Sequence, residues 1–323
     1  MSEKVTVGEV TAEPGTKKLG FIKVAEKASM PVKLPMFVVN GSSPGPKLWV
    51  QGGIHGDEHE GPQAIIRLAR EIDPDKLKGV LIAVPVVNTL AFEACQRTSP
   101  VDNIDLNRVF PGKADGFISE QIAYNIFNEI KANADFLVDL HSGGSDIIQR
   151  THSLYCEVGN SEKDKMSKEM AEAFAISGQL LIGLKGMYLK GTCSLEASKV
   201  GIPSMVGEAG GEGRVEEDLV LVQYTGLLNL MRHLKMIPGE PIHVEKFKYA
   251  GETYFVRATR GGYLQPRVGL DEKVTKGSLI ARITNLFGEE LEAIRSPMDG
   301  IVVGVRTLPA VNTGDRVILI AGL

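Results

Sequence analysis

Two histidines and three acidic residues lie within ten positions in the stretch GGIHGDEHEG, residues 52–61, directly after the apolar run LWVQ. His55 and Glu58 are three residues apart on a tight turn that enters a helix, so an imidazole nitrogen and a carboxylate oxygen can face one side. Such a pair suits Zn²⁺, which binds these ligands at about 2.0–2.2 Å. The flanking glycines favour this interpretation because they allow close backbone approach. The alternative is a surface turn with solvated histidines. His59 competes with His55, but on a helix it points about 100° away from Glu58.

A candidate third ligand, His141, follows the apolar run FLVDL and precedes SGG. Three protein ligands that leave the fourth position to water form a catalytic rather than a structural zinc site. Asp139, two residues earlier on the same strand, could accept the second N–H of a ligand histidine. The alternative for His141 is a core histidine bonded to a backbone carbonyl.

Glu208 lies at the end of a third apolar strand, in VGEAGGEG. In open α/β sheets, sites form beyond the carboxyl ends of strands. A carboxylate placed there beside a metal could act as a general base. The alternatives are a turn carboxylate that caps a backbone N–H, and Glu212 as the functional acid of the same loop.

The irregular stretch RTSPVDNIDLNRVFPG, residues 97–112, is a candidate binding loop. Long loops inside compact domains are usually functional. The planar guanidinium of arginine suits a bidentate pair with a carboxylate, either of a ligand or of the loop itself. The charged and amide residues concerned are Arg97, Asp102, Asp105, Asn107 and Arg108.

The elements that must position these residues alternate between apolar strands and amphipathic helices. This pattern predicts an α/β fold with a mixed, mostly parallel sheet flanked by helices. Strands are expected at 47–53, 79–88, 135–144, 153–158 and 201–211, and helices at 60–72, 118–134, 161–177 and 216–236.

Both ends of the chain differ from this alternating centre. Residues 1–45 contain short strands and turns, and after Pro241 strand-sized runs and glycine turns predominate, without a convincing helix. We therefore expect a catalytic domain over 1–240, which includes the N-terminal β segment, and a small all-β domain over 241–323.

The composition fits a globular protein with a large core. The chain has 323 residues, of which 43% are hydrophobic, and a formal net charge of −4. This charge argues against nucleic acid as the main partner, and the absence of long apolar runs argues against a membrane span. Three widely spaced cysteines fit neither a disulfide framework nor a CxxC metal site, so a cytoplasmic location is expected.

Four motifs together, GGIHGDEHEG, DNIDLNRVFPG, DLHSGG and GEAGG, resemble the succinylglutamate desuccinylase/aspartoacylase family, which is itself similar to the zinc carboxypeptidases. The motifs occur in the family's order through residues 45–235. The resemblance implies a carboxypeptidase-like sheet flanked by helices and one catalytic zinc per chain. It assigns the zinc to His55, Glu58 and His141.

The resemblance also implies roles for four further residues. Glu208 would be the general base and then the general acid. Asn107 and Arg108 would grip a substrate carboxylate, and Arg97 would polarise the scissile carbonyl. No match is found for the family's other substrate contacts between residues 142 and 207, so the acyl and amino-acid preference stays open.

The C-terminal segment resembles a biotinyl/lipoyl-type β-barrel through SPMDGIV and VNTGD. The hairpin that would carry the attachment lysine reads TNLFGEELEAI and contains no lysine. A carrier role is therefore disfavoured. A structural role, a lid over the zinc site and a subunit contact remain alternatives.

The function expected from these observations is hydrolysis of the amide bond of small N-acyl amino acids. Deacetylation of N-acetyl-diaminobutyrate, which similar two-domain proteins perform, is one form of this activity. One alternative is a metallocarboxypeptidase that acts on short peptides, and another is a non-catalytic binding protein that retains the fold. A homo-oligomer is compatible with the sequence.

Overall fold

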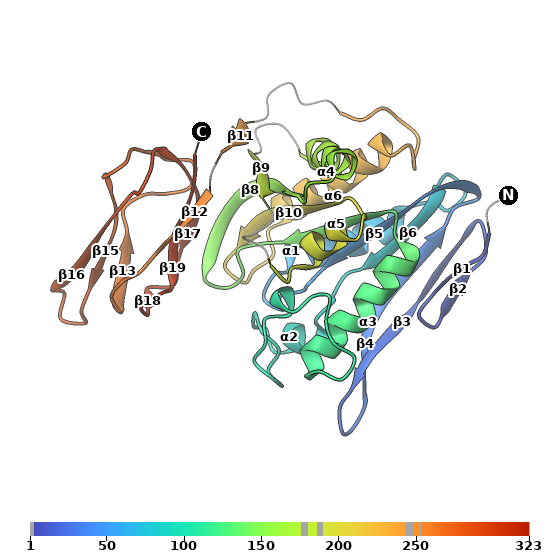
Figure 1. Ribbon diagram of the computed structural model, residues 1–323, viewed down its shortest axis with the longest axis horizontal. Helices are drawn as coiled ribbons and strands as arrows, with labels where there is room; N and C mark the ends of the chain where they lie inside the picture. The colour runs from blue at the N-terminus through green and yellow to red at the C-terminus, as the bar shows by residue number, and fades with distance from the viewer. Residues whose placement is uncertain (1–2, 176–179, 186–189, 243–247, 252, 323) are drawn as a thin grey trace.

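The computed structural model describes residues 3–175, 180–185, 190–242, 248–251 and 253–322. Within these residues the chain forms a large mixed sheet, a four-stranded sheet and a short N-terminal hairpin, with helices on both faces of the large sheet (Figure 1). The hairpin consists of β1 (Val5–Val7) and β2 (Val10–Ala12). None of the described helices has the length and apolar character needed to cross a membrane.

The centre of the large sheet is parallel, in the order β10-β7-β5-β6. These strands are buried on both faces, as Leu48, Trp49 and Val50 of β5 illustrate with no solvent exposure. A strand covered on both sides needs a continuous apolar run rather than an alternating one, which explains LWV in the sequence. The four strands are β5 (Ser43–Gly52), β6 (Lys78–Val84), β7 (Phe136–His141) and β10 (Ser204–Gly211).

The large sheet is mixed, as expected, with antiparallel strands on both sides of its parallel centre. Beyond β6 the order continues through antiparallel strands β4 and β3, and beyond β10 it continues through antiparallel β8. Only β9 and β11 return to a parallel arrangement at that side. Among the described pairs of these nine strands, β3 to β11, five are parallel and three are antiparallel, so parallel pairs are in the majority there. The strands are β3 (Thr16–Glu26), β4 (Pro31–Asn40), β8 (Ile147–Glu157), β9 (Leu180–Lys185) and β11 (Lys248–Ala250).

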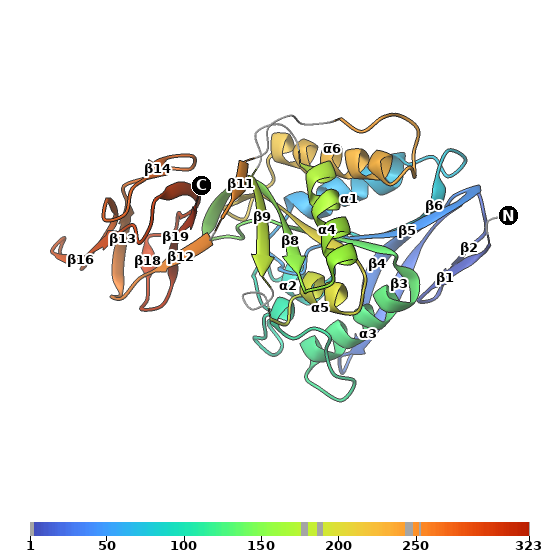
Figure 2. The ribbon, with the colours of Figure 1, turned by 45° about the horizontal axis from the view of Figure 1, so that its top comes forward.

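The helices cover the sheet in two layers (Figure 2). Helices α1, α4 and α6 pack on one face around Leu68, Phe174 and Leu230, whereas α3 and α5 pack on the other around Ile126 and Ala197. The described helices are α1 (Glu60–Glu71), α2 (Thr89–Glu93), α3 (Ile118–Asn133), α4 (Ser161–Phe174), α5 (Cys193–Lys199) and α6 (Glu217–His233).

The four expected helices are present as α1, α3, α4 and α6, whereas the short helices α2 and α5 are not apparent in the sequence. Residues 176 and 177, at the end of the helix expected over 161–177, lie outside the described residues. A helix of five to seven residues is too short to show a clear hydrophobic period, which explains why α2 and α5 were missed.

The C-terminal unit is all-β, as expected, but it is joined to the large sheet. Strand β17 pairs antiparallel with β8, where Gly304 lies opposite Gln149, so the large sheet continues into β19 and β12. The four-stranded sheet has the order β16-β15-β13-β18. The strands are β12 (Thr253–Arg257), β13 (Gly262–Pro266), β14 (Lys273–Val274), β15 (Leu279–Thr284), β16 (Glu290–Arg295), β17 (Gly300–Arg306), β18 (Ala310–Val311) and β19 (Arg316–Ala321).

Candidate metal centre and substrate cavity

The three strands that carry the candidate site residues are neighbours. β5, β7 and β10 run parallel, so their carboxyl ends meet at one edge of the sheet. His55 and Glu58 lie between β5 and α1, His141 ends β7, and Glu208 lies in β10. The sheet thus brings together four residues that the sequence spreads over 154 positions, as counted from 55 to 208.

A close backbone approach shapes the turn between β5 and α1. A Cβ atom built on Gly56 would lie 2.0 Å from the carbonyl carbon of Ala91 in α2. The Gly56 amide also donates to the Gln96 carbonyl at 3.1 Å. No other residue fits there without displacing the backbone, so this glycine fixes the loop that presents His55.

His55, Glu58 and His141 form one buried cluster. His55 Nδ1 lies 2.7 Å from Glu58 Oε1, and His141 Nδ1 lies 2.8 Å from Glu58 Oε2. One ligand atom from each residue can be chosen so that all three lie within 4.8 Å of one another. Two imidazole nitrogens and a carboxylate are a donor set typical of zinc, and their convergence fits a single divalent cation.

The charges within the cluster are strongly coupled. Burial alone would raise the pKa of the Glu58 carboxyl, but the two imidazoles hold it well below its usual value. Burial would likewise lower the pKa of His141, yet Asp139 and Glu58 raise it well above its usual value. The lowered pKa of Glu58 favours its ionised form, and an ionised carboxylate between two imidazoles suits a bound cation.

The outward-facing nitrogens of both histidines contact carboxylates. His55 Nε2 lies 3.1 Å from Asp105 Oδ1, and His141 Nε2 lies 3.3 Å from Asp139 Oδ2. Such partners fix the ring orientation and leave Nδ1 free to bind a metal. The contact of Asp139 was expected, whereas that of Asp105 was missed because it joins residues 50 positions apart.

Arg97 belongs to the same group of charges. Its Nε and Nη2 donate to Asp105 Oδ2 at 3.2 and 3.1 Å, and its Nη1 lies 3.5 Å from Glu58 Oε1. The internal Arg–Asp pair considered from the sequence is therefore present. It does not remove Arg97 from the site, because the guanidinium also reaches the metal cluster and lines the cavity.

Asn107 and Arg108 occupy a 3₁₀ turn, Leu106–Arg108, that faces the cluster. The buried Asn107 accepts a hydrogen bond from the Cys193 amide at its Oδ1, at 3.0 Å, and its Nδ2 lies 3.3 Å from His141 Nε2. Arg108 donates to the Asn107 carbonyl at 2.6 Å. Burial lowers the pKa of the Arg108 guanidinium, although Asp105 opposes this effect. Both side chains line the cavity.

Glu208 lies directly opposite His141 in the register of β10 and β7. Gln149 Nε2 donates to Glu208 Oε2 at 3.2 Å. Burial, with a contribution from the Glu58 carboxylate, raises the pKa of the Glu208 carboxyl to about 8, although His141 opposes the shift. A carboxyl group with this pKa can take up and release a proton near neutrality.

The two competing residues lie elsewhere. His59 is the residue before α1, and its ring packs edge-on against Phe92 at 5.6 Å. Glu212 pairs with Arg214 and has a left-handed backbone, with φ of 61°. Neither is among the described residues that line the cavity.

A cavity of about 1040 Å³ lies over the cluster, between the large sheet and the C-terminal unit. The C-terminal wall was not identified in the sequence. It includes Arg316, whose guanidinium lies 4.4 Å above the centre of the Phe255 ring. Burial, together with the charges of Arg97, Arg108 and Arg257, lowers the pKa of Arg316 to about 10. This concentration of positive charge favours an anionic ligand.

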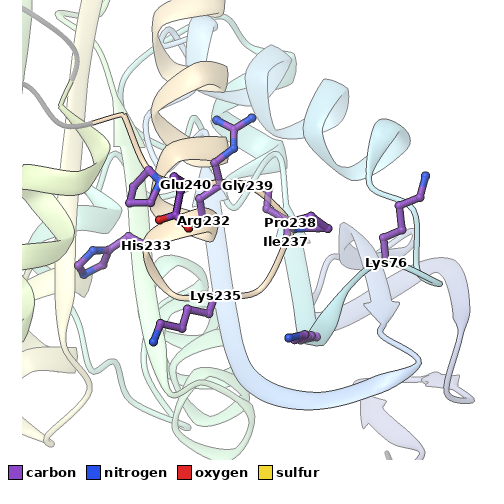
Figure 3. A pocket seen from close by; sticks show the side chains of 10 residues that line it. Lys76, Arg232, His233, Lys235, Ile237, Pro238, Gly239 and Glu240 are labelled. Carbon is purple, nitrogen blue, oxygen red and sulfur yellow. The ribbon is translucent and has the colours of Figure 1, made fainter.

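A second cavity, of about 550 Å³, lies beside the end of α6 and the start of β6. Figure 3 shows the basic side chains Lys76, Arg232, His233 and Lys235 around it. Because β6 is parallel to β5, its start is at the sheet edge opposite to the metal cluster. This cavity is therefore separate from the candidate active site.

Comparison with known proteins agrees with the geometry. The family model of the succinylglutamate desuccinylase/aspartoacylase catalytic domain matches residues 44–234. N-alpha-acetyl-L-2,4-diaminobutyric acid deacetylase of Halomonas elongata is 31% identical over 315 residues, which cover 94% of this chain and 90% of the relative.

Two solved structures share the whole architecture. The product-bound ectoine utilization protein EutE (DoeB) of Ruegeria pomeroyi superimposes with a TM-score of 0.90 at 26% identity, over 100% of both chains. The succinylglutamate desuccinylase/aspartoacylase of Rhodobacter sphaeroides superimposes with a TM-score of 0.85 at 28% identity, over 94% of both chains. The chain belongs to the succinylglutamate desuccinylase/aspartoacylase family.

Proposed function

We propose that this chain is a zinc-dependent hydrolase that cleaves the amide bond of small N-acyl amino acids. The observation that carries the proposal is the His55–Glu58–His141 cluster beside Glu208 in one cavity. The similarity to the Halomonas elongata deacetylase supports N-alpha-acetyl-L-2,4-diaminobutyrate as the first substrate to test.

His55, Glu58 and His141 would hold one Zn²⁺. When bound, this ion supplies Lewis-acid polarisation of a carbonyl and acidifies a coordinated water. The chain contributes the donor atoms and their orientation, since Asp105 and Asp139 hold the two rings from outside. Loss of such outer partners typically costs about 10–100-fold in metal affinity.

Glu208 would move the protons of the reaction. Its carboxylate takes a proton from the attacking water and later delivers it to the leaving nitrogen. Gln149 holds one carboxyl oxygen at 3.2 Å and leaves the other available for this transfer. The pKa of about 8 allows Glu208 to act in both directions near neutral pH.

Three residues of the 97–112 loop would position the substrate. Asn107 and Arg108 bind the carboxylate of the amino acid and so fix the scissile bond beside the cluster. Arg97 donates to the carbonyl oxygen as negative charge develops on it, and loss of one such donor typically costs about 10²–10³-fold in rate. The pair with Asp105 keeps the Arg97 guanidinium oriented during this step.

The C-terminal unit would close the cavity without carrying a covalent group. We place the boundary of the catalytic domain at residues 240–241 and assign the C-terminal unit to the biotinyl/lipoyl-like scaffolds. The exposed residues at the tip of its β15–β16 hairpin include Leu286 and Phe287, and none of residues 285–289 is a lysine. The free cysteines Cys95, Cys156 and Cys193 support a cytoplasmic location.

A hydrolysis screen tests the function. Purified protein loaded with Zn²⁺ is assayed against N-acetyl, N-succinyl and N-formyl amino acids, including N-alpha-acetyl-L-2,4-diaminobutyrate, and against dipeptides. Release of the free amino acid from the acyl substrates supports the proposal. Cleavage restricted to dipeptides would instead indicate a carboxypeptidase, and binding without turnover would indicate a non-catalytic protein.

A further inference from the structure

Three side chains form a row across adjacent strands at the candidate site. Glu208 of β10 is paired in register with His141 of β7 on one side and with His152 of β8 on the other. Paired residues leave a sheet on the same face, with Cβ atoms about 4.5–5.5 Å apart. All three line the same cavity. His152 is therefore the neighbour of Glu208 on the side away from the metal cluster.

His152 presents an unused hydrogen-bond acceptor to this cavity. The residue is 2% exposed, and its Nδ1 lies 2.9 Å from the carbonyl oxygen of Arg150. A carbonyl oxygen can only accept, so Nδ1 carries the hydrogen. Burial lowers the pKa of the ring to about 4, so the imidazole is neutral and Nε2 has a free lone pair. Within the described part of the chain, Nε2 makes no hydrogen bond.

Several polar side chains of the same cavity are donors or are already paired. Arg97 and Arg108 contribute guanidinium groups, and the Gln149 amide donates to Glu208. A buried acceptor next to the proton-transferring residue favours a substrate that brings a donor to it. In an N-acyl amino acid, the N–H of the scissile amide is on the nitrogen that must reach Glu208.

We propose that His152 Nε2 accepts a hydrogen bond from the N–H of the scissile amide and so positions the leaving nitrogen beside Glu208. The inference rests on the proposed deacylase function and adds a substrate-positioning residue to it. The nitrogen keeps this hydrogen when the C–N bond breaks, while Glu208 delivers the additional proton that completes the amine.

The test compares an amide with an ester that lacks the N–H. The substrates are an N-acetyl amino acid and the O-acetyl ester of the matching 2-hydroxy acid. For His152→Leu, we expect kcat/KM to fall about tenfold on the amide, as for the loss of one buried hydrogen bond, and less than about twofold on the ester. His152→Gln, whose amide oxygen can accept, should recover part of the amide activity. An equal loss on both substrates, or no loss on the amide, overturns the inference.

A matched control and a second measurement keep the test decisive. His233→Leu alters a histidine at the distant basic cavity and should change neither rate (Figure 3). If His152→Leu does not fold, the wild type is titrated with a phosphonamidate and the corresponding phosphonate ester, which differ by the same N–H. We expect about tenfold weaker inhibition by the phosphonate, and equal inhibition overturns the inference.

The outcome also separates this inference from the proposed function. If the zinc-loaded wild type cleaves neither the amide nor the ester, the deacylase function itself is wrong. If it cleaves both and the His152 variants lose activity in equal proportion, only the role of His152 is wrong.

Discussion

Glu208 and His141 are opposite each other on neighbouring parallel strands, so the candidate base and a candidate metal ligand leave the sheet side by side. Their separation is set by backbone hydrogen bonds of the central sheet rather than by a loop. Sites built on strands hold their geometry more closely than sites on loops. This relationship explains why the carboxyl group of Glu208 is close enough to the charges of the cluster for them to alter its pKa.

Replacement of Glu208 by Gln should separate proton transfer from metal binding. The variant keeps the size of the side chain but cannot take up a proton, so we expect kcat to fall about 10²–10⁴-fold. Metal content, measured by atomic absorption, should stay equal to that of the wild type. A fully active variant would show that another group transfers the proton.

Glu208 should also affect the pH dependence of stability in metal-free protein. Its pKa is raised by burial from an ordinary value of 4.5 to about 8, so the folded state binds this proton more tightly than the unfolded chain. The stabilisation is complete below the unfolded pKa and is lost as the pH rises through about 8. We therefore expect Glu208→Gln to increase Tm relative to the wild type more at pH 9 than at pH 5. A difference in Tm that does not change with pH would contradict the buried, raised carboxyl group.

Removal of metal should destabilise the protein. The three buried ligands bind a cation only when folded, and a ligand at about 1,000 times its Kd adds about 4 kcal/mol of stability. We expect a chelator to lower Tm and added Zn²⁺ to restore it in thermal unfolding scans. Glu58→Gln should not respond to Zn²⁺, because the shared carboxylate is lost. A wild-type Tm that is insensitive to the chelator would argue against the metal site.

The central strands and the metal cluster could be predicted because their signals are local. Buried parallel strands require continuous apolar runs, and the residues that follow such strands meet at one sheet edge. The antiparallel flanks were not predicted. The pairing of β17 with β8 joins residues more than 150 positions apart, such as Gln149 and Gly304, and nothing in either segment specifies the other as its partner.

Other contacts of the site also join residues that are far apart in the sequence, and they were not predicted for the same reason. From the sequence, Asp105 is expected to be a loop residue that can pair with an arginine. In the fold its Oδ2 does accept from Arg97, but its Oδ1 also contacts His55. Arg316 belongs to the C-terminal unit, whose place over the cluster depends on strand pairing between distant segments. A lid over the site was one of three alternatives for this unit, and the sequence could not choose among them.

Replacement of Asp105 by Asn should weaken metal binding. The Asp105 carboxylate contacts His55 Nε2 at 3.1 Å and orients the ring, so its loss should reduce zinc affinity about 10–100-fold. Competition with a chromophoric chelator measures this change. Asp102→Asn is the matched control, because Asp102 lies in the same loop but accepts from the Ser119 amide at 2.8 Å. Equal affinities of the two variants would show that Asp105 does not support the ligand.

Arg316 should set the affinity for anionic substrates from the C-terminal side of the cavity. Its guanidinium is stacked on Phe255, and within the described residues it has no carboxylate at ion-pair distance. The positive charges of Arg97, Arg108 and Arg257 already lower its pKa after burial, so a bound carboxylate would relieve their repulsion.

We therefore expect Arg316→Met to raise KM about tenfold for N-acyl amino acids, an effect of the size of one charged hydrogen bond, while kcat changes little. Steady-state kinetics with the carboxylate and the corresponding carboxamide substrate check this, because the neutral carboxamide should show almost no difference between variant and wild type. Arg260→Met removes an exposed arginine of the same unit that is not among the described cavity residues, and it should leave both KM values unchanged. If Arg316→Met raises KM equally for both substrates, the C-terminal wall acts through shape and not through charge.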